Sequence, residues 1–555
     1  MSNYGAIDDD FEPLLSSASP PPAPPSTSSR SSRPRQPYLF TGGLGLSREG
    51  SMTSLHSEDD FRQHNMALRY RLYNRLDPGG QQLRMPDHVI PSEYFSILPF
   101  DDMKDSSGKQ SSLVTIFSLW NTMMGTSLLA MPWALQQAGL FWGIFLMLAL
   151  ALLCFYTAYR VLESPKGLSA GMDPLMMEFS DVCRHFLGKT GEYIAVGFSV
   201  IVILGGIMVY WVLMSNFLFY TGTVVYEALQ PNSSTIPIME NKTFTCDVYC
   251  PSDVSLPPLL ERYPTQPFTT NWFFPSWSFD QLWQLQRTVP IYLAFLTFPL
   301  MNFKSPTFFT KFNVLGTISV LYLLVFTGSK LAECGFNMNF VDPTSIHYAK
   351  PFNWRFPALT GTLTLSYFIH NAVITILRNQ KNPENNTRDL SIGYSLAAFC
   401  YVFIGFAFYA GFPVQRSCIS DNFLNNFGAG DIMSSTARMF LLFQMITVLP
   451  LLMFLIRSQL CYAFVGKTWP GLGSVFILNF AIMCMAVSVA IFYPKVGSLL
   501  RYVGAMSGLV YVFALPCIVY MKKLHSEGKL TRSKRIIHTT IIVLGVLNFI
   551  AQFVI

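Results

Sequence analysis

The chain has 555 residues, of which 51% are hydrophobic and only 13% are charged. Since an ordinary soluble domain carries about 25% charged residues, this composition excludes a soluble globular protein and predicts a polytopic membrane protein. The net charge of +6 does not indicate a single basic surface, because polar residues gather in the first part of the chain and long apolar runs follow. We therefore expect a lipid bilayer around most of the chain and no nucleic-acid partner.

Residues 1–59 are expected to form a disordered cytosolic tail. The stretch 16–37 is almost entirely Ser, Pro and Arg, and such a sequence cannot bury enough apolar surface to offset chain entropy. The beginning of the chain lacks the pattern of a cleavable signal peptide, so the tail should stay in the cytosol. Two short patterns match signals that sorting adaptors read, and together they favour an endosomal or lysosomal membrane. Their defining residues are Tyr4, Ile7, Asp10, Leu14 and Leu15.

Residues 60–111 form a second cytosolic segment, in which aromatic and aliphatic side chains return. It contains MALRYRLYNRL at 66–76 and MPDHVIPSEYFSILPF at 85–100. Because such side chains favour burial, the segment is predicted to fold onto a soluble partner or onto the cytosolic end of the membrane region. The alternative is a linker without fixed structure.

Eleven apolar runs approach the length of about 20 residues that crosses a bilayer. Lys and Arg gather in alternate connections between these runs, and positive charge near helix ends resists translocation. The pattern predicts an all-α protein with eleven transmembrane helices, a cytosolic N-terminus and a lumenal C-terminus. The expected spans are 113–136, 141–162, 192–226, 288–303, 308–332, 357–377, 391–412, 434–456, 471–492, 499–521 and 536–554.

The longest connection, 228–286, falls on the lumenal side and should be glycosylated. Its two sequons begin at Asn232 and Asn241. The loop also contains Cys246 and Cys250, while Cys418 lies in another connection on that side. In an oxidising lumen Cys418 is expected to pair with Cys250, or else with Cys246, and the remaining cysteine would stay free. Alternatively, all three are unpaired.

The first expected span carries a polar cluster within an apolar run. A bilayer provides no water, so non-helical backbone survives there only where it lines a cavity, and polar side chains at depth are functional candidates. Gly125 permits unwinding, which would expose N–H groups of one half-helix to a carboxylate and C=O groups of the other to an ammonium or Na⁺. The cluster predicts a broken helix that binds a zwitterion, with a small-residue packing face as the alternative. It consists of Asn121, Thr122, Met123, Met124, Gly125, Thr126 and Ser127.

A second interrupted run, 358–377, lies five spans after the first. Paired interruptions at corresponding positions of two halves are typical of an inverted-repeat transporter. His370 and Asn371 are candidates for lining its site, although a single histidine in such a run is more often structural. The two repeats would be 112–334 and 356–521, followed by an eleventh helix in 535–555.

Two further spans carry small or polar residues. In the eighth, the hydroxyl of Thr447 could complete a site for a hard cation, because such ions favour oxygen ligands. The alternative is that this hydroxyl binds the carbonyl of its own preceding turn. In the tenth, the small residues of 504–508 predict close packing against another helix.

Seven strings give most of the chain, 60–555, a specific resemblance to solute carrier family 38, the sodium-coupled neutral amino-acid transporters. They are WNTMMGTS (120–127), SDVCRHF (180–186), VYWVLMSNFLF (209–219), NFKSPTFFTKFNVLGT (302–317), LTGTLTLSYFIHN (359–371), FLNNF (423–427) and LLFQMITVLPLL (441–452). The chain is most similar to a lysosomal, arginine-sensing branch of that family. The resemblance implies the bacterial leucine-transporter fold, a 5+5 inverted repeat plus one helix.

The resemblance also implies ligands and partners. Na⁺ would bind between Asn121 and Thr447. Arginine would bind from the lumen at the broken first helix, at Thr122, Met123, Met124, Gly125, Thr126 and Ser127. The cytosolic tail would plug the cytosolic vestibule in the absence of substrate and would dock the Ragulator scaffold and Rag GTPases. The positions for this docking are Tyr73, Leu76, Pro86 and Pro91.

The leading hypothesis is a transporter of the lysosomal or late-endosomal membrane. It would respond to arginine, export leucine and other neutral amino acids by alternating access, and signal amino-acid sufficiency to the target-of-rapamycin pathway. We expect no enzymatic activity and no cofactor other than a coupling Na⁺. Two alternatives stay open: an amino-acid receptor without flux, and a membrane-embedded transferase that uses His370 and Asn371.

Overall fold

A computed structural model describes the membrane region of the chain. The described residues are 92–96, 110–168, 177–229, 246–251, 279–304, 307–378, 380–428, 430–465 and 469–554. All of them belong to one compact unit, Ser57–Ile555. The expected sorting, docking and glycosylation residues lie outside the described residues. These are Tyr4, Ile7, Asp10, Leu14, Leu15, Tyr73, Leu76, Pro86, Pro91, Asn232 and Asn241.

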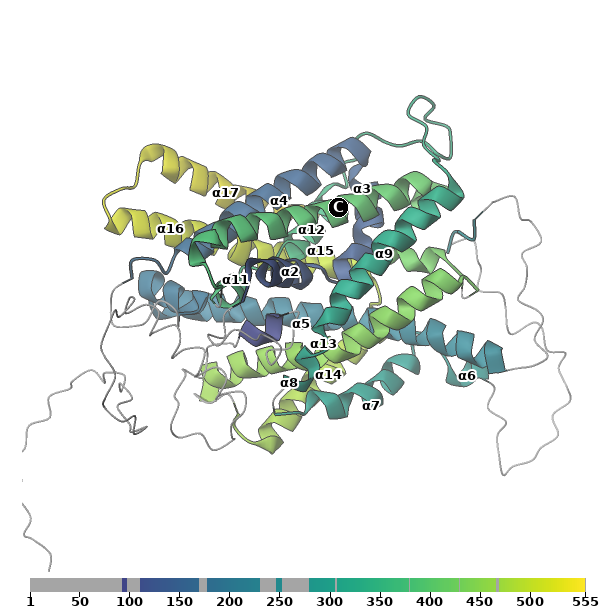
Figure 1. Cartoon of the computed structure of the whole chain (residues 1–555), viewed down its shortest axis with the longest axis horizontal. Coiled ribbons are helices and arrows are strands. Elements are labelled where there is room, and N and C mark those ends of the chain that lie inside the picture. Colours follow the sequence, from purple (N-terminus) through teal and green to yellow (C-terminus); the bar gives the residue numbers. More distant parts are fainter. Residues whose placement is uncertain are drawn as a thin grey trace, which may run out of the picture. The chain divides into compact units, whose positions relative to one another are not determined.

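The described part of the chain is helical and contains isolated β-bridges but no β-strand. Every expected span contains at least one helix, so the apolar runs were correctly identified (Figure 1). The longer helices are α2 (Ser112–Met123), α3 (Met131–Ala138), α4 (Leu140–Glu163), α5 (Phe179–Leu229), α7 (Val289–Met301), α9 (Asn313–Cys334), α10 (Pro357–Ser366), α12 (Asn386–Gly411), α13 (Ile432–Val465), α14 (Leu472–Phe492), α15 (Val496–Ser507), α16 (Leu515–Ser526) and α17 (Arg532–Ala551). The shorter elements are η1 (Ser92–Phe95), η3 (Thr126–Ala130), α6 (Phe279–Leu282), α8 (Thr307–Thr310), α11 (Val373–Leu377), η5 (Pro383–Asn385), η6 (Arg416–Cys418), η7 (Phe423–Asn426) and η8 (Gly508–Ala514).

Eight helices in the described residues are long and apolar enough to cross a membrane, and the bent pair formed by α2 and η3–α3 makes a ninth. The other two expected spans are represented by shorter helices: α7 has 13 residues, and α10 and α11 have 10 and 5. The structure therefore establishes a multi-pass membrane protein. The count of eleven crossings and the inverted repeat stay predictions.

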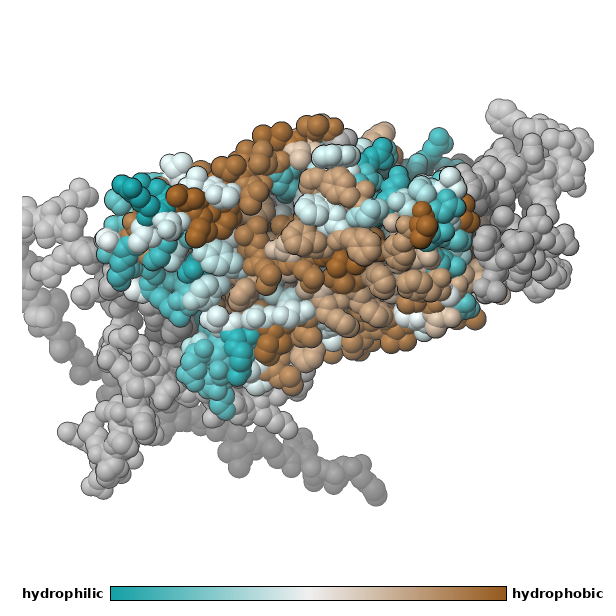
Figure 2. All heavy atoms as spheres, turned by 90° about the horizontal axis from the view of Figure 1, so that it is seen from above, coloured by the Kyte–Doolittle hydropathy of each residue, from teal (hydrophilic) through white to brown (hydrophobic). Residues whose placement is uncertain are grey.

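The surface of the helical region has the polarity expected in a bilayer. In Figure 2, apolar side chains gather over the middle of the face and polar side chains lie toward both ends. On α4, Leu152 is 71% exposed and Phe141 60%, and on α14, Ile477 is 71% exposed. Such large side chains are stable on a surface only if lipid or protein covers them, so these faces of α4 and α14 are expected to contact lipid.

Small residues allow α15 to approach α10 closely, as the sequence predicts for 504–508. An added Cβ at Gly504 would lie 2.1 Å from the carbonyl oxygen of Gly361, and one at Gly508 would lie 2.9 Å from Cβ of Thr364. Neither contact leaves room for a methyl group. In the described structure, α10 also packs against α3 and α4, and α2 packs against α12. The two interrupted segments are therefore held by the same group of helices.

Two disulfides link the described part of the loop 228–286, which is expected to be lumenal, to the helical region. Cys250 pairs with Cys418, which confirms the expected pair, and Cys246 pairs with Cys334. The expectation of a free cysteine in this loop was wrong. Cys334 is the last residue of α9 and is not among the three cysteines that the sequence suggests for pairing. Its position at the end of the helix is what places it within reach of the loop.

Candidate functional site

The first transmembrane segment is interrupted where the sequence predicts it. Helix α2 ends at Met123, Met124 and Gly125 have extended backbones, and the chain resumes as η3 and α3 after a bend of 52°. Pro132 is accommodated in the first turn of α3, where the N–H that proline lacks would have no helical partner. The polar cluster therefore lies at a genuine break in the helix.

Open space lies beside the break. A Cβ added at Gly125 would meet no atom within 4 Å. Thr122, Gly125 and Thr126 are partly exposed, whereas Met123, Met124 and Ser127 are buried. Of the six expected substrate contacts, Thr122, Gly125 and Thr126 thus expose side-chain or backbone surface to a ligand. Met123, Met124 and Ser127 could contact a ligand only through their backbone.

The second interruption separates α10 from α11. Helix α10 ends at Ser366, and helix α11 begins at Val373. Both breaks meet at one side chain of α12, because the Tyr401 hydroxyl lies 2.6 Å from the carbonyl oxygen of Met123 and 3.1 Å from that of Ser366. The hydroxyl of Tyr394 donates to the carbonyl of Tyr367 at 3.0 Å. Two tyrosines of α12 therefore satisfy backbone carbonyls that the breaks leave without helical partners.

Sequence analysis missed these tyrosines. Tyr401 lies in an apolar run, AAFCYVFIGF, where an aromatic residue is usually an ordinary packing residue. The available signal was chemical: a buried tyrosine needs a partner for its hydroxyl, and α12 belongs to the same bundle as two segments with unpaired carbonyls. That signal does not identify which carbonyl the tyrosine reaches.

The structure places His370 away from the open space at Gly125. Its ring is fully buried, and Nε2 lies 2.9 Å from the Thr157 hydroxyl on α4. That hydroxyl also lies 3.1 Å from the carbonyls of Leu153 and Cys154, to which it donates. The contacts of His370 are those of a packing residue, whereas Asn371 is partly exposed.

Asn121 and Thr447, the expected Na⁺ ligands, each hydrogen-bond to another residue: the Asn121 side chain donates to the carbonyl of Asn313 at 3.4 Å. The Thr447 hydroxyl donates to the carbonyl of Gln444 at 2.8 Å, the bonding within its own helix that was the alternative expectation. Asn121 and Gln444 both face Gly316 of α9, where an added Cβ would lie 2.7 Å from Oδ1 of Asn121 and 2.9 Å from Nε2 of Gln444.

Two amide oxygens near this position have the chemistry that a hard cation needs. Oδ1 of Asn121 and Oε1 of Gln444 are buried, and neither has a hydrogen-bond partner among the described residues. Na⁺ favours uncharged oxygen ligands of this kind, by the logic that governs other hard cations. The Gln444 atom that faces Gly316 is Nε2, so Gln444 would have to turn its amide to place Oε1 beside Asn121.

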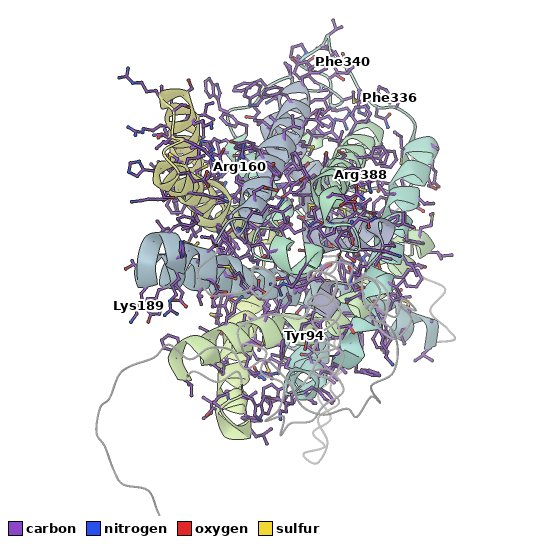
Figure 3. The ribbon with its side chains drawn as sticks, turned by 60° about the vertical axis from the view of Figure 1, so that its left-hand side comes forward. Tyr94, Arg160, Lys189, Phe336, Phe340 and Arg388 are labelled. Atoms are coloured by element: carbon purple, nitrogen blue, oxygen red, sulfur yellow. A yellow bond between two sulfur atoms is a disulfide. The ribbon has the colours of Figure 1, made fainter. Side chains whose placement is uncertain are left out.

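The expected cytosolic side is closed by polar contacts between the two halves of the chain. Arg378, after α11, forms a 2.8 Å ion pair with Glu178, and both side chains are almost completely buried. The Thr375 hydroxyl donates to the other oxygen of this carboxylate at 2.9 Å. Gln380 hydrogen-bonds to Asp389 and, at 3.0 Å, to the hydroxyl of Ser112. Figure 3 labels Arg388, which pairs with Asp389 at this end.

Part of the cytosolic segment 60–111 also packs here. Tyr94 of η1, labelled in Figure 3, is buried and contacts the ring of Phe454 on α13 with centroids 5.1 Å apart. The Asn313 side chain donates to the carbonyls of Tyr94 and Ser96, at 3.1 and 3.0 Å. The described residues of this segment therefore bind the membrane region itself, one of the two destinations that the sequence predicts.

Two further contacts close the expected lumenal side. Lys330 of α9 and Asp431, before α13, form a buried ion pair at 2.7 Å. Asp421, in the connection between α12 and α13, accepts a 2.9 Å hydrogen bond from the backbone N–H of Gly497 at the start of α15. Burial raises the pKa of the Asp421 carboxyl, although backbone hydrogen bonds oppose this shift.

Comparison with known proteins identifies the family of this chain. Residues 108–239 and 270–555 match the family model described as transmembrane amino acid transporter protein. The sodium-coupled neutral amino acid transporter 9 homolog of Caenorhabditis elegans is 66% identical over 599 aligned positions, covering 100% of this chain and 95% of that protein. Neutral amino acid transporter 9 of Xenopus tropicalis is 40% identical, covering 90% and 93%. The protein of that name in Rattus norvegicus is 38% identical, covering 99% of both.

These relatives are transporters rather than enzymes, which removes the transferase alternative for His370 and Asn371. Two interrupted helical segments, one of them with open space at Gly125, are also the arrangement that a carrier of small zwitterions requires. By its sequence and its architecture, the chain belongs to the transmembrane amino acid transporter family.

Proposed function

We propose that the protein is an arginine-responsive transporter of the lysosomal or late-endosomal membrane, which exports leucine and other neutral amino acids by alternating access. The observation that carries this proposal is the meeting of two broken helices beside open space at Gly125. The break supplies N–H groups for an α-carboxylate and C=O groups for an ammonium. Arginine as the activating ligand comes from the resemblance, as do the six expected contacts Thr122, Met123, Met124, Gly125, Thr126 and Ser127.

The same proposal assigns the topology. The chain crosses the membrane eleven times as a 5+5 inverted repeat plus one helix, with a cytosolic N-terminus and a lumenal C-terminus. The two disulfides support a lumenal position for the loop 228–286, because disulfides persist in oxidising compartments. The glycans at Asn232 and Asn241 belong to this loop. The sorting signals of the tail, which adaptors would read, supply the lysosomal address.

Na⁺ is the proposed coupling ion. Support comes from the two buried amide oxygens of Asn121 and Gln444 and from the sodium-coupled name of the nematode relative. Bound there, Na⁺ would join α2 to α13, which belong to different repeats. Thr447 would contribute only after its hydroxyl turned away from the Gln444 carbonyl.

The cytosolic tail is proposed to signal amino-acid sufficiency. Tyr94 and Ser96 are held against α9 and α13 in a position to plug the cytosolic vestibule. Release of this segment would free the positions Tyr73, Leu76, Pro86 and Pro91 to dock the Ragulator scaffold and Rag GTPases. The same contacts favour a second candidate, a receptor in which ligand binding releases the tail without any flux.

Labelled leucine and arginine fluxes in proteoliposomes, with and without Na⁺, test the proposal. Thr126→Trp should abolish saturable flux, because a large ring would fill the space beside Gly125. Leu152→Trp is the matched control, since that side chain is 71% exposed on the lipid-facing side of α4 and has room for the ring. If the native chain binds arginine but shows no counterflow, the protein is a receptor without flux.

A further inference from the structure

The Tyr401 hydroxyl has more hydrogen-bonding neighbours than it can satisfy as a donor. It lies 2.6 Å from the carbonyl oxygen of Met123, 3.1 Å from that of Ser366 and 3.3 Å from the hydroxyl of Ser127. Carbonyl oxygens only accept hydrogen bonds, and a phenol carries a single proton. Tyr401 can therefore donate to one of the two carbonyls at a time, while the Ser127 hydroxyl is able to donate to the Tyr401 oxygen.

The two carbonyls are equivalent in their electrostatic setting. Met123 is the last residue of α2 and Ser366 is the last residue of α10, so each carbonyl belongs to a helix C-terminus, which carries partial negative charge. Two such ends facing one buried hydroxyl attract positive charge to this point. The shorter distance to Met123 indicates that the proton points there, which leaves the Ser366 carbonyl with the weaker contact.

Packing fixes the ring that carries this hydroxyl. Tyr401 is completely buried and meets the ring of Tyr367 edge to face, with centroids 5.3 Å apart. The Tyr367 hydroxyl in turn donates to the carbonyl of Met147 on α4 at 3.2 Å. A phenylalanine at position 401 keeps these ring contacts and loses the hydroxyl, both its proton and the oxygen to which Ser127 can donate.

We propose that Tyr401 is a positioning residue for amino-acid binding, whose single proton holds the end of one half-helix and leaves the other, at Ser366, to accept the ammonium group of the substrate. This inference rests on the proposed function, because it places the substrate at the two breaks. That state, with Tyr401 donating to one carbonyl, is the substrate-free one. When substrate binds, its ammonium group, with three N–H donors, pairs with both carbonyls, and the Tyr401 proton turns to the Ser127 hydroxyl.

The proposal predicts an unusual effect of Tyr401→Phe. Without the hydroxyl, both carbonyls lack a donor in the substrate-free protein, and the substrate supplies donors to them when it binds. The substrate-free state therefore loses more stability than the bound state, so the KM for leucine should fall about two- to tenfold, the equivalent of one neutral hydrogen bond. The maximal rate should fall as well, because release becomes slower.

Tyr322→Phe is the matched control. Tyr322 lies on α9, away from both breaks, and its hydroxyl donates to a single carbonyl, that of Met433, at 3.0 Å. Its loss should lower the maximal rate through a smaller folded fraction, with the KM unchanged. A proportional loss of rate at constant KM in both variants would show that Tyr401 is only structural and would overturn the proposal. A KM that rises in Tyr401→Phe would also overturn it, because Tyr401 would then donate to the substrate.

A second measurement covers the case in which Tyr401→Phe does not fold. Incorporation of 3-fluorotyrosine at position 401 keeps the ring and makes the hydroxyl proton a stronger donor, so the substrate-free state gains stability and the KM should rise. An unchanged or lower KM with 3-fluorotyrosine would refute the inference. If the native chain shows no saturable leucine flux, the proposed function itself fails. If the native flux is saturable but the KM is unchanged in the Tyr401 variants, only the role of Tyr401 fails.

Discussion

The contact between α10 and α15 makes Gly504→Ala the most direct test of the fold. The added methyl carbon would lie 2.1 Å from the carbonyl oxygen of Gly361 and 2.9 Å from Cβ of Leu365. The first neighbour is backbone, so no side chain can rotate to make room. A non-bonded carbon and oxygen need about 3 Å or more, so the two helices would have to separate by roughly 1 Å along this contact.

The size of the effect follows from the length of the contact. Gly508 lies one turn later and also faces α10, with Thr364 only 2.9 Å from a built Cβ. Separation at Gly504 therefore loosens the packing on both turns. Overpacking of a well-packed contact costs about 1–3 kcal/mol, and we expect a value near the upper end because the obstructing atom belongs to the backbone. For a chain of 555 residues, the melting temperature should fall by roughly 2–3 °C.

The assay is thermal unfolding of the purified protein in detergent, monitored by the loss of monodisperse material. Gly206→Ala is the control, because Gly206 lies within α5 and an added Cβ there meets no atom within 4 Å. Alanine is a better helix former than glycine, by about 1 kcal/mol, so this control should be neutral or stabilising. Equal melting temperatures for the Gly504 and Gly206 variants would refute the close approach of α10 and α15.

Three further predictions concern the two ends of the membrane region. Asp421→Asn should gain stability relative to the native protein as the pH rises from about 4 to about 7. Burial raises the pKa of the Asp421 carboxyl in the folded protein above its ordinary value of 3.8. The protonated carboxyl therefore contributes fully to the free energy of unfolding at low pH, and this contribution is lost as the carboxyl ionises. Glu178→Gln should lower the stability by about 1–3 kcal/mol, because it removes the carboxylate that accepts hydrogen bonds from Arg378 and Thr375. Cys334→Ser should release one thiol of the lumenal loop to maleimide labelling, and peptide mapping of the native protein should find this disulfide.

Each of these predictions has an outcome that contradicts it. Melting curves of Asp421→Asn and the native protein that stay parallel across the pH range would show that Asp421 is not buried. Lys166→Gln is the control for Glu178→Gln, because Lys166 forms an exposed pair and should leave the melting temperature unchanged. Similar effects of both variants would contradict a buried ion pair. A disulfide between Cys246 and Cys418, found by peptide mapping of the native protein, would contradict the two disulfides described above.

The helices and the first break were predictable because the bilayer imposes strict conditions on a sequence. A backbone without water must be helical or line a cavity, so a polar cluster around Gly125 inside an apolar run has few structural explanations. The same constraint makes small residues informative, and the packing of Gly504 against Gly361 confirms the interpretation of 504–508. In each case the local sequence contains the whole physical argument.

The contacts between distant segments were not predictable in this way. Cys334 reaches the lumenal loop only because α9 ends at that residue. The pairing of Arg378 with Glu178 joins residues 200 positions apart, and each residue taken alone resembles an ordinary charge at a helix end. The only sequence signal for Tyr401 is that a buried tyrosine needs a partner for its hydroxyl, and this does not identify the two carbonyls on other helices. Such features depend on the packing of the helices, which the pattern of a single span does not encode.

The strength of the contacts differs between the ends and the middle of the membrane region, and this difference bears on transport. Buried ion pairs close the ends, at Glu178–Arg378 and at Lys330–Asp431. Neutral hydrogen bonds from Tyr401 connect the two breaks, and each is worth only about 0.5–1.5 kcal/mol. An amino-acid substrate can supply that much by its own hydrogen bonds, whereas removing one partner of a buried ion pair costs several times more. Substrate binding is therefore able to rearrange the middle first, and each end can open only if its two charges separate into water together.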